Sequence, residues 1–157
     1  MMRIGTGFDI HKHKKDIDLF VGTVKIEGPG FIAHSDGDII VHALIDALLG
    51  TVALGDIGDF FPSDDEEWSN ASGEELLLII KDKVYSAGLT IENIDVIVLS
   101  NIIHISSVKK EIKNSIAKLL EITPSIISVK GKTTDSYGIV VEEEASASFV
   151  TVLGSVN

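Results

Sequence analysis

Residues 34 to 62 read HSDGDIIVHALIDALLGTVALGDIGDFFP, and the predicted architecture is built around this stretch. Between positions 39 and 49 almost every side chain is apolar, which is typical of a helix buried on most of its circumference. Asp38, His42 and Asp46 interrupt the apolar run at intervals of four residues, so they share one face of that helix. A buried carboxylate or imidazole without a partner is costly, so we expect this polar face to bind something.

The start of the helix is rich in capping residues. Ser35 followed by Asp38 three positions later resembles a capping box, in which side chains accept hydrogen bonds from the free amides of the first turn. Acidic residues there also suit the positive end of the helix dipole. Capping alone would explain Ser35, Asp36 and Asp38. It would not explain His42 and Asp46, which lie in the second and third turns.

A second group of polar residues lies on the N-terminal strand. Residues 2 to 11 alternate with the period of a half-buried strand, and Asp9 and His11 fall on the face that also carries Gly5 and Gly7. Such a pair can act as metal ligands, although on a strand it more often belongs to a solvated face. If this strand packs beside the buried helix, Asp9 and His11 meet His42, and two imidazoles with one carboxylate form a normal ligand set for catalytic zinc.

The composition narrows the classes of protein. The 157 residues suit one domain, and 24 acidic against 13 basic residues give a net charge of -11, so neither nucleic acid nor an anionic membrane is expected as a partner. Because cysteine is absent, a metal site must use histidines and carboxylates. No signal peptide or membrane span is visible, so we expect a cytoplasmic bacterial protein, or an organelle stroma protein that has lost its transit peptide.

Shorter patterns complete the predicted fold. Residues 19 to 30 suggest one or two short strands that end in a Gly-Pro-Gly turn, and the glycines around Asp56 suggest a tight, non-helical path. The later predicted elements are a helix capped by Ser72 that stops at Gly88, a strand at 94–100, a helix at 106–120, and strands at 126–131 and 145–153. We predict a single α+β domain over residues 1–157, with a four-stranded mixed sheet backed by helices.

Three segments resemble a known enzyme family. FDIH at 8–11, AHSDGDIIVHALIDALLGTVALGDIG at 33–58 and FP at 61–62 are similar to 2-C-methyl-D-erythritol 2,4-cyclodiphosphate synthase, the cyclase of the non-mevalonate isoprenoid pathway. The resemblance implies a homotrimer with active sites between neighbouring subunits. It also implies conversion of 4-diphosphocytidyl-2-C-methyl-D-erythritol 2-phosphate to the cyclic 2,4-diphosphate and CMP. This is an in-line phosphoryl transfer that depends on positioning and charge neutralisation.

The resemblance also implies roles for individual residues. Asp9, His11 and His42 match the zinc ligands, and Asp46 matches a residue that orients a zinc histidine. His34, Ser35 and Asp56 match positions that hold the 2-phosphate and the erythritol hydroxyls. The residues expected to act in catalysis are His34, Thr133 and Asp135. The full set expected to contact substrate is Asp9, His11, His34, Ser35, Asp56, Ile57, Gly58, Ser100, His104, Ile105, Gly131, Lys132, Thr133 and Thr134.

The second half of the chain departs from the family pattern at three positions. Asp135 stands where the family has a glutamate that holds a second divalent ion, Mg²⁺ or Mn²⁺, at the diphosphate, and aspartate is one methylene shorter. His104 stands where the cytidine loop has a lysine. Glu142 stands where many members place an arginine at the trimer axis. Three glutamates there would repel an anion, so we expect no isoprenoid diphosphate in the central cavity.

Two other functions remain open from the sequence. The altered loops at 100–105 and 132–135 would also suit a zinc-binding trimer that has lost nucleotide recognition and serves as a binding or structural protein. A metal-dependent phosphohydrolase would use the same metal ligands but would release open-chain phosphates. The retention of every polar residue on a buried helix favours the active cyclase, because each is costly without a partner.

Overall fold

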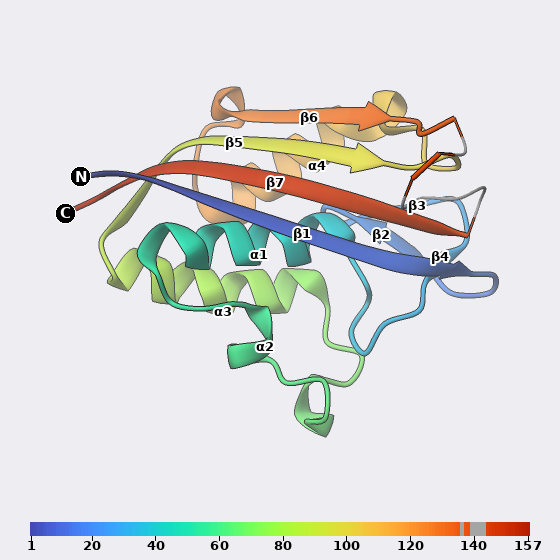
Figure 1. Cartoon of the computed structure of the whole chain (residues 1–157), viewed down its shortest axis with the longest axis horizontal. Coiled ribbons are helices and arrows are strands. Elements are labelled where there is room, and N and C mark those ends of the chain that lie inside the picture. Colours follow the sequence, from blue (N-terminus) through green and yellow to red (C-terminus); the bar gives the residue numbers. More distant parts are fainter. Residues whose placement is uncertain (136, 139–143) are drawn as a thin grey trace.

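A mixed β-sheet covered by helices on one face forms the body of the protein (Figure 1). The computed structural model describes residues 1–135, 137–138 and 144–157. Within these ranges the main sheet has five strands in the order β4-β1-β7-β5-β6, and a separate pair is formed by β2 and β3. The strands are β1 (Met2–Lys14), β2 (Leu19–Val21), β3 (Val24–Ile26), β4 (Gly30–Phe31), β5 (Leu89–Leu99), β6 (Ile127–Lys132) and β7 (Ala145–Val156).

The helices lie between and after these strands. They are α1 (Ile39–Val52), α2 (Ile57–Phe60), α3 (Gly73–Ser86) and α4 (Ile105–Leu120), with short 3₁₀ turns η1 (Glu66–Trp68) and η2 (Pro124–Ile126). The α+β class is confirmed, and the sheet is mixed because β5 and β6 run parallel while the other pairs are antiparallel. The predicted count of four strands is wrong. The additional strand is β4, a two-residue segment that begins at Gly30, the last residue of the Gly-Pro-Gly turn, and pairs with the end of β1.

The central helix α1 packs closely on the glycine face of β1. A Cβ atom at Gly5 would lie 1.9 Å from the Ala47 carbonyl oxygen, and one at Gly7 would lie 1.9 Å from the Ala43 carbonyl oxygen. The space that the two glycines leave is therefore filled by the helix itself. This close approach brings the Asp9 and His11 positions of β1 next to α1.

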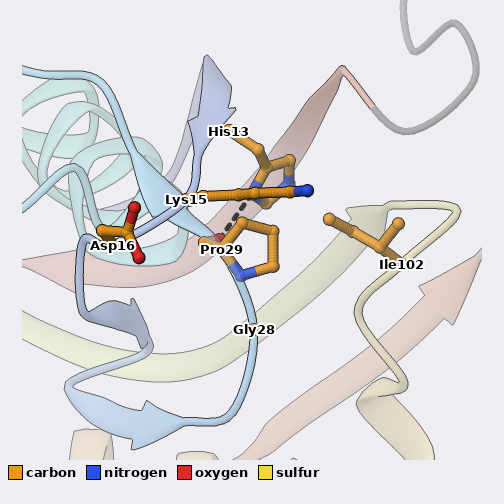
Figure 2. Close-up of a pocket in the computed structure, with 6 residues that line it drawn as sticks. All are labelled: His13, Lys15, Asp16, Gly28, Pro29 and Ile102. Carbon is orange, nitrogen blue, oxygen red and sulfur yellow. Dashed lines mark hydrogen bonds between the residues drawn. The ribbon is translucent and has the colours of Figure 1, made fainter.

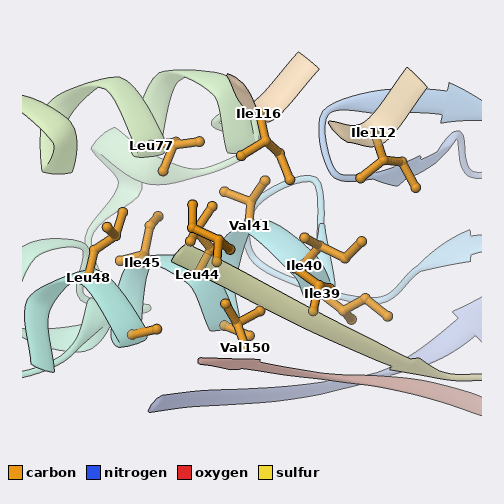
Figure 3. Packing of buried hydrophobic residues seen from close by; sticks show 14 of the residues in the cluster. Ile39, Ile40, Val41, Leu44, Ile45, Leu48, Leu77, Ile112, Ile116 and Val150 are labelled. Atoms are coloured by element: carbon orange, nitrogen blue, oxygen red, sulfur yellow. The ribbon is translucent and has the colours of Figure 1, made fainter. Parts of the chain in front are cut away.

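The apolar core lies between the helices and this face of the sheet (Figure 3). Leu44, Ile45 and Leu48 of α1 are fully buried, and Leu77 of α3 and Ile116 of α4 belong to the same cluster. The amphipathic pattern of α4, with apolar residues recurring every three to four positions, places that side of the helix inward. The predicted burial of the 39–49 segment is confirmed.

The cap of α1 differs from the prediction. Asp38, not Ser35, is the N-cap residue, and its carboxylate accepts hydrogen bonds from the amides of Ile40 and Val41. It also accepts from the amides of Gly22 and Thr23, at 2.8 and 2.6 Å. Burial raises the pKa of Asp38, against the opposing effect of these amides. Asp38 therefore joins α1 to the β2–β3 turn and does not belong to the polar face of His42 and Asp46.

The remaining predicted elements are present with shifted ends. The strand expected from residue 94 begins at Leu89, because residues 89–91 already pair with β7. The segment around Asp56 is not free of helix: α2 occupies Ile57–Phe60, with Asp56 as its N-cap. In the part of the chain that the structure describes, no helix is long and apolar enough to cross a membrane.

Candidate metal and nucleotide site

Asp9 and His11 of β1 meet His42 of α1 at one point. The Asp9 Oδ2 atom lies 3.0 Å from His11 Nε2 and 3.0 Å from His42 Nδ1. The two ring nitrogens are 3.3 Å apart. Together the three residues form a group that could hold a metal ion, as the spacing in the sequence predicts.

The donor set fits a divalent transition metal. Tetrahedral zinc with bonds of about 2.0 to 2.2 Å separates its ligand atoms by about 3.3 to 3.6 Å, close to the separations of these three atoms. The set is two imidazole nitrogens and one carboxylate oxygen, which is common in catalytic zinc sites with one open position. Without a cation, the carboxylate of Asp9 and the lone pairs of the two rings would face one another, so a proton or a metal ion is required between them.

The electrostatics of the site agree with this geometry. Burial acts to raise the pKa of Asp9, but hydrogen bonds and charge from His11 and His42 outweigh it and lower the pKa to about 2. Burial acts to lower the pKa of His42, but the Asp9 carboxylate, with smaller effects from Asp38 and Asp36, raises it. The site therefore favours a carboxylate beside a positive charge, which either a protonated imidazole or a metal ion can supply.

The second nitrogen of His42 is held by Ser35. The Ser35 Oγ atom lies 2.9 Å from His42 Nε2, and it also accepts a hydrogen bond from the Gly37 amide. A partner on the outer nitrogen fixes the orientation of a ligand histidine and leaves Nδ1 directed at the metal position. The sequence did not indicate this contact, because Ser35 precedes the helix and lies seven residues from His42.

Asp46 has a different partner from the expected one. Its Oδ1 atom accepts a hydrogen bond of 2.8 Å from the amide of Ile57, which ties α1 to the first residue of α2. Burial and the nearby carboxylates of Asp56 and Asp9 raise the pKa of Asp46, against the effect of the Ile57 amide. The orientation of a zinc histidine by Asp46 stays a prediction.

A hollow of about 300 Å³ opens over the metal group. We call it the metal hollow. His34 lies in its wall, and its Nε2 donates to the Asp65 carbonyl oxygen at 2.9 Å. The predicted residues that line the hollow are Asp9, His11, His34, Ser35, His42, Asp46, Ile57 and Gly58. Phe61, Ser63 and Trp68 also line the hollow, and the sequence did not predict them as site residues. The one available signal was Trp68, a single tryptophan in an acidic loop. The Trp68 ring packs edge-on against Phe61, with ring centroids 4.8 Å apart.

A separate hollow of about 420 Å³ lies where β5 and β6 end and α4 begins. We call it the nucleotide hollow, after the role that the family resemblance implies for these loops. The predicted residues that line it are Ser100, His104, Ile105, Gly131, Lys132 and Thr133, and it also includes Lys109 and Lys130, which the sequence did not suggest. The two hollows share no lining residue.

Several predicted site residues lie outside both linings. Asp56 Oδ1 accepts from the amides of Gly58 and Asp59, so it caps α2. Thr134 bonds to Asn101, its amide donating to Asn101 Oδ1 at 3.2 Å. Asp135 has a left-handed backbone, with φ of 48°, and accepts from the Thr133 hydroxyl at 3.3 Å. Glu142 lies outside the described residues.

Comparison with known proteins identifies the family. Residues 2–155 match the YgbB family. The chain belongs to the YgbB family. Over 153 residues it is 39% identical to the 2-C-methyl-D-erythritol 2,4-cyclodiphosphate synthase of Treponema denticola, an alignment that spans 97% of this chain and 95% of that relative. The resemblance found in the three sequence segments is therefore confirmed.

Solved structures of relatives have the same fold as this YgbB protein. A Plasmodium falciparum IspF structure described as a CDP complex superposes with a TM-score of 0.87 at 35% identity, covering 99% of this chain and 97% of that one. The bifunctional IspDF of Campylobacter jejuni gives a TM-score of 0.95 at 34% identity, covering all of this chain and 43% of that one. The fold is thus shared both with free-standing synthases and with one part of a larger enzyme.

Proposed function

We propose that this chain is an active 2-C-methyl-D-erythritol 2,4-cyclodiphosphate synthase of the non-mevalonate pathway. The observation that carries the proposal is the convergence of Asp9, His11 and His42 at the metal hollow, in a member of the YgbB family. The substrate is the cytidine diphosphate-linked methylerythritol 2-phosphate, and the products are the cyclic 2,4-diphosphate and CMP.

The bond changes involve one substrate molecule. An oxygen of the 2-phosphate attacks the β-phosphorus and forms the ring-closing phosphorus–oxygen bond. The bond from the β-phosphorus to the bridging oxygen breaks, and CMP leaves with that oxygen and the bonding electron pair. Nothing covalent is required of the protein, so its contribution is to align the two phosphates and to offset their negative charge.

Asp9, His11 and His42 would hold a zinc ion or another divalent transition metal. When bound, such an ion polarises a phosphoryl oxygen as a Lewis acid and offsets the charge that develops in the transition state. Ser35 keeps the His42 ring oriented. His34, Ser35 and Asp56 would hold the 2-phosphate and the erythritol hydroxyls, and the first turn of α2, at Ile57 and Gly58, forms the adjoining wall.

The nucleotide would bind in the nucleotide hollow of a neighbouring subunit. The metal hollow and the nucleotide hollow of one chain share no lining residue, which supports a complete site formed by two copies. Ser100, His104 and Ile105 would contact the cytidine, while Gly131, Lys132, Thr133 and Thr134 would contact its phosphates. A second ion, Mg²⁺ or Mn²⁺, would bind at Asp135 with Thr133 beside it.

An exposed apolar surface supports the homotrimer. Ile4 is 66% exposed, Phe8 42% and Phe149 43%, all on the face of β1 and β7 opposite to α1. Phe8 and Phe149 are cross-strand partners with ring centroids 4.6 Å apart. Large apolar side chains exposed together on one face of a sheet are typical of a protein interface. We propose that the trimer buries this face around its axis, and that the axial cavity binds no isoprenoid diphosphate.

Phosphorus NMR tests the reaction. The purified protein is mixed with the cytidine diphosphate-linked substrate, zinc and magnesium, and compared with a zinc-stripped sample. Zinc-dependent formation of CMP and a cyclic diphosphate is the expected result. Open-chain phosphates would indicate a phosphohydrolase instead. Bound zinc with neither product nor CDP binding would indicate a protein that has lost nucleotide recognition. The cytoplasm, or an organelle stroma, remains the predicted compartment.

A further inference from the structure

A chain of hydrogen bonds connects the strand of the metal ligands with the loop of the nucleotide hollow. His13 lies on β1, two residues after His11. Its Nδ1 donates to the Pro29 carbonyl oxygen at 2.8 Å, as Figure 2 shows, and its Nε2 lies 2.7 Å from the hydroxyl of Ser146 on β7. The Ser146 hydroxyl in turn lies 2.7 Å from that of Ser100, which directly follows β5.

The sheet register explains why these side chains meet. His13 is on the same face of β1 as Asp9 and His11, because strand residues alternate between faces. Ser146 pairs directly with His11 in the antiparallel ladder, so its side chain points to that same face. The three polar groups therefore lie in one row, from β1 across β7 to the residue that follows β5.

The two serines of this hydrogen-bond chain are buried, so water cannot replace their hydrogen-bond partners. Ser146 is 0% exposed and Ser100 is 4% exposed. The ring of His13 also packs on Phe31 of β4, with centroids 4.5 Å apart. Two hydrogen bonds and a ring contact fix the position of His13, so Ser146 and Ser100 meet a rigid partner.

Ser100 transmits this position to the loop. Its Oγ atom accepts hydrogen bonds from the amides of Ile102 and Ile103, at 3.2 and 2.9 Å, which shape the turn between β5 and α4. Its amide donates to the Lys132 carbonyl oxygen, which joins the turn to the end of β6. Ile102 lies across a hollow of about 560 Å³ from His13 (Figure 2). The same loop forms one wall of the nucleotide hollow through Ile103, His104 and Ile105.

We infer that His13 is a positioning residue for nucleotide binding, which acts through Ser146 and Ser100 to hold the 100–105 loop in its binding conformation. The inference rests on the proposed function, since it assigns the loop to the nucleotide. His13 touches no substrate in this scheme. Its loss should weaken the ground-state binding of the cytidine diphosphate moiety and leave the metal group intact.

The test compares three variants with the wild-type protein, loaded with zinc and magnesium. His13→Phe keeps a ring against Phe31 and removes both nitrogens. Ser146→Ala removes only the central hydroxyl, so it serves where the first variant does not fold. Ser148→Ala is the matched control, because Ser148 is a fully buried serine on the same strand and face whose hydroxyl has no partner among the described residues. The measurements are CDP affinity by calorimetry, zinc content, and KM and kcat.

The expected result is a split between binding and chemistry. His13→Phe and Ser146→Ala should each weaken CDP binding and raise KM about tenfold, which corresponds to about 1.4 kcal/mol. They should leave zinc content unchanged and change kcat less than about twofold, because the effect is on binding and not on the transition state. The double variant should resemble either single variant, since both interrupt the same chain.

Each contrary outcome has its own meaning. Unchanged CDP affinity in both variants, or an equal loss in Ser148→Ala, overturns the role of His13 while the proposed function stands. A fall in zinc content together with the fall in CDP affinity also overturns the role of His13, because the substitution would then act on the metal group at His11 and His42. If the wild-type protein neither binds CDP nor forms the cyclic product, the proposed function fails, and the inference falls with it.

Discussion

The metal hollow and the nucleotide hollow are built in opposite ways. The candidate metal ligands lie on two regular elements, β1 and α1, that pack directly on each other through Gly5 and Gly7. Their three ligand atoms lie within 3.3 Å of one another before any ion is considered. The nucleotide hollow is instead formed by the loop after β5, the start of α4 and the second half of β6, and Lys132 and Thr133 in its wall are exposed.

This difference reflects the different demands of metal binding and nucleotide binding. A metal group has to be preorganised, because an error of a fraction of an ångström weakens the coordination, and packing on a buried helix provides that accuracy. A nucleotide can be bound by an open wall that a second subunit closes. We therefore expect changes in the metal hollow to abolish the chemical step, and changes in the nucleotide hollow to act through substrate binding.

Removal of a metal ligand should have the largest effect. His42→Ala deletes one of the three ligands and leaves the Asp9 carboxylate without its main partner, so zinc binding should be lost. Turnover should fall by at least about a thousandfold, since metal charge stabilisation is worth several kcal/mol. Zinc content and phosphorus NMR measure the two effects, with circular dichroism as the check on folding. Normal turnover in a folded His42→Ala protein would place the chemistry elsewhere.

Subunit mixing tests whether the two hollows cooperate across an interface. His42→Ala damages only the metal hollow, and Lys132→Glu reverses a charge in the wall of the nucleotide hollow. Each variant alone should be nearly inactive. Among all the trimers formed when the two variants are co-expressed in equal amounts, about a quarter of the sites should pair an intact metal hollow with an intact nucleotide hollow, so activity should return to about that fraction. Mixed trimers as inactive as the parents would show that each site lies within one chain.

The sequence predicted the first region far better than the second. The apolar run at 39–49 and the period of residues 2–11 are local patterns, and they were sufficient to bring Asp9, His11 and His42 together. The interpretation of residues 2–11 was incomplete, however, because the alternation does not say which face is buried. Here the small glycines face the helix, and the large apolar residues Ile4 and Phe8 are exposed in the single chain.

Contacts between distant residues were beyond local patterns. Asp38 was expected on the polar face of α1, but its carboxylate turns to the β2–β3 turn, where the backbone amides of Gly22 and Thr23 need an acceptor. The partner of His42 Nε2 is likewise Ser35 and not a residue four positions along the helix. Both choices depend on how loops pack, and periodicity carries no information on that.

The pH dependence of stability should have opposite signs with and without metal. The pKa of His42 is raised in the folded protein, so the metal-free fold gains stability from the protonated ring below about pH 6.5 and loses it as the pH rises through the folded-state pKa. Zinc needs the neutral ring, so its affinity should rise about tenfold per pH unit over the same range. Melting temperatures at a series of pH values, with a chelator or with zinc, measure both slopes. Parallel slopes would mean that His42 is not the group that exchanges a proton for the metal.

Substitution of Ser35 should have the smallest effect, and it tests whether Ser35 orients His42 or contacts the substrate. Ser35→Ala removes the partner of His42 Nε2 but keeps all three ligands, so zinc should still bind, about tenfold more weakly, as is typical for the loss of a group that orients a ligand. Competition with a zinc indicator measures the affinity. At saturating zinc, any remaining rise in KM reports a direct contact of Ser35 with the 2-phosphate. Unchanged zinc affinity with a raised KM would mean that Ser35 serves the substrate alone, and the orientation of His42 would then depend on its packing within α1.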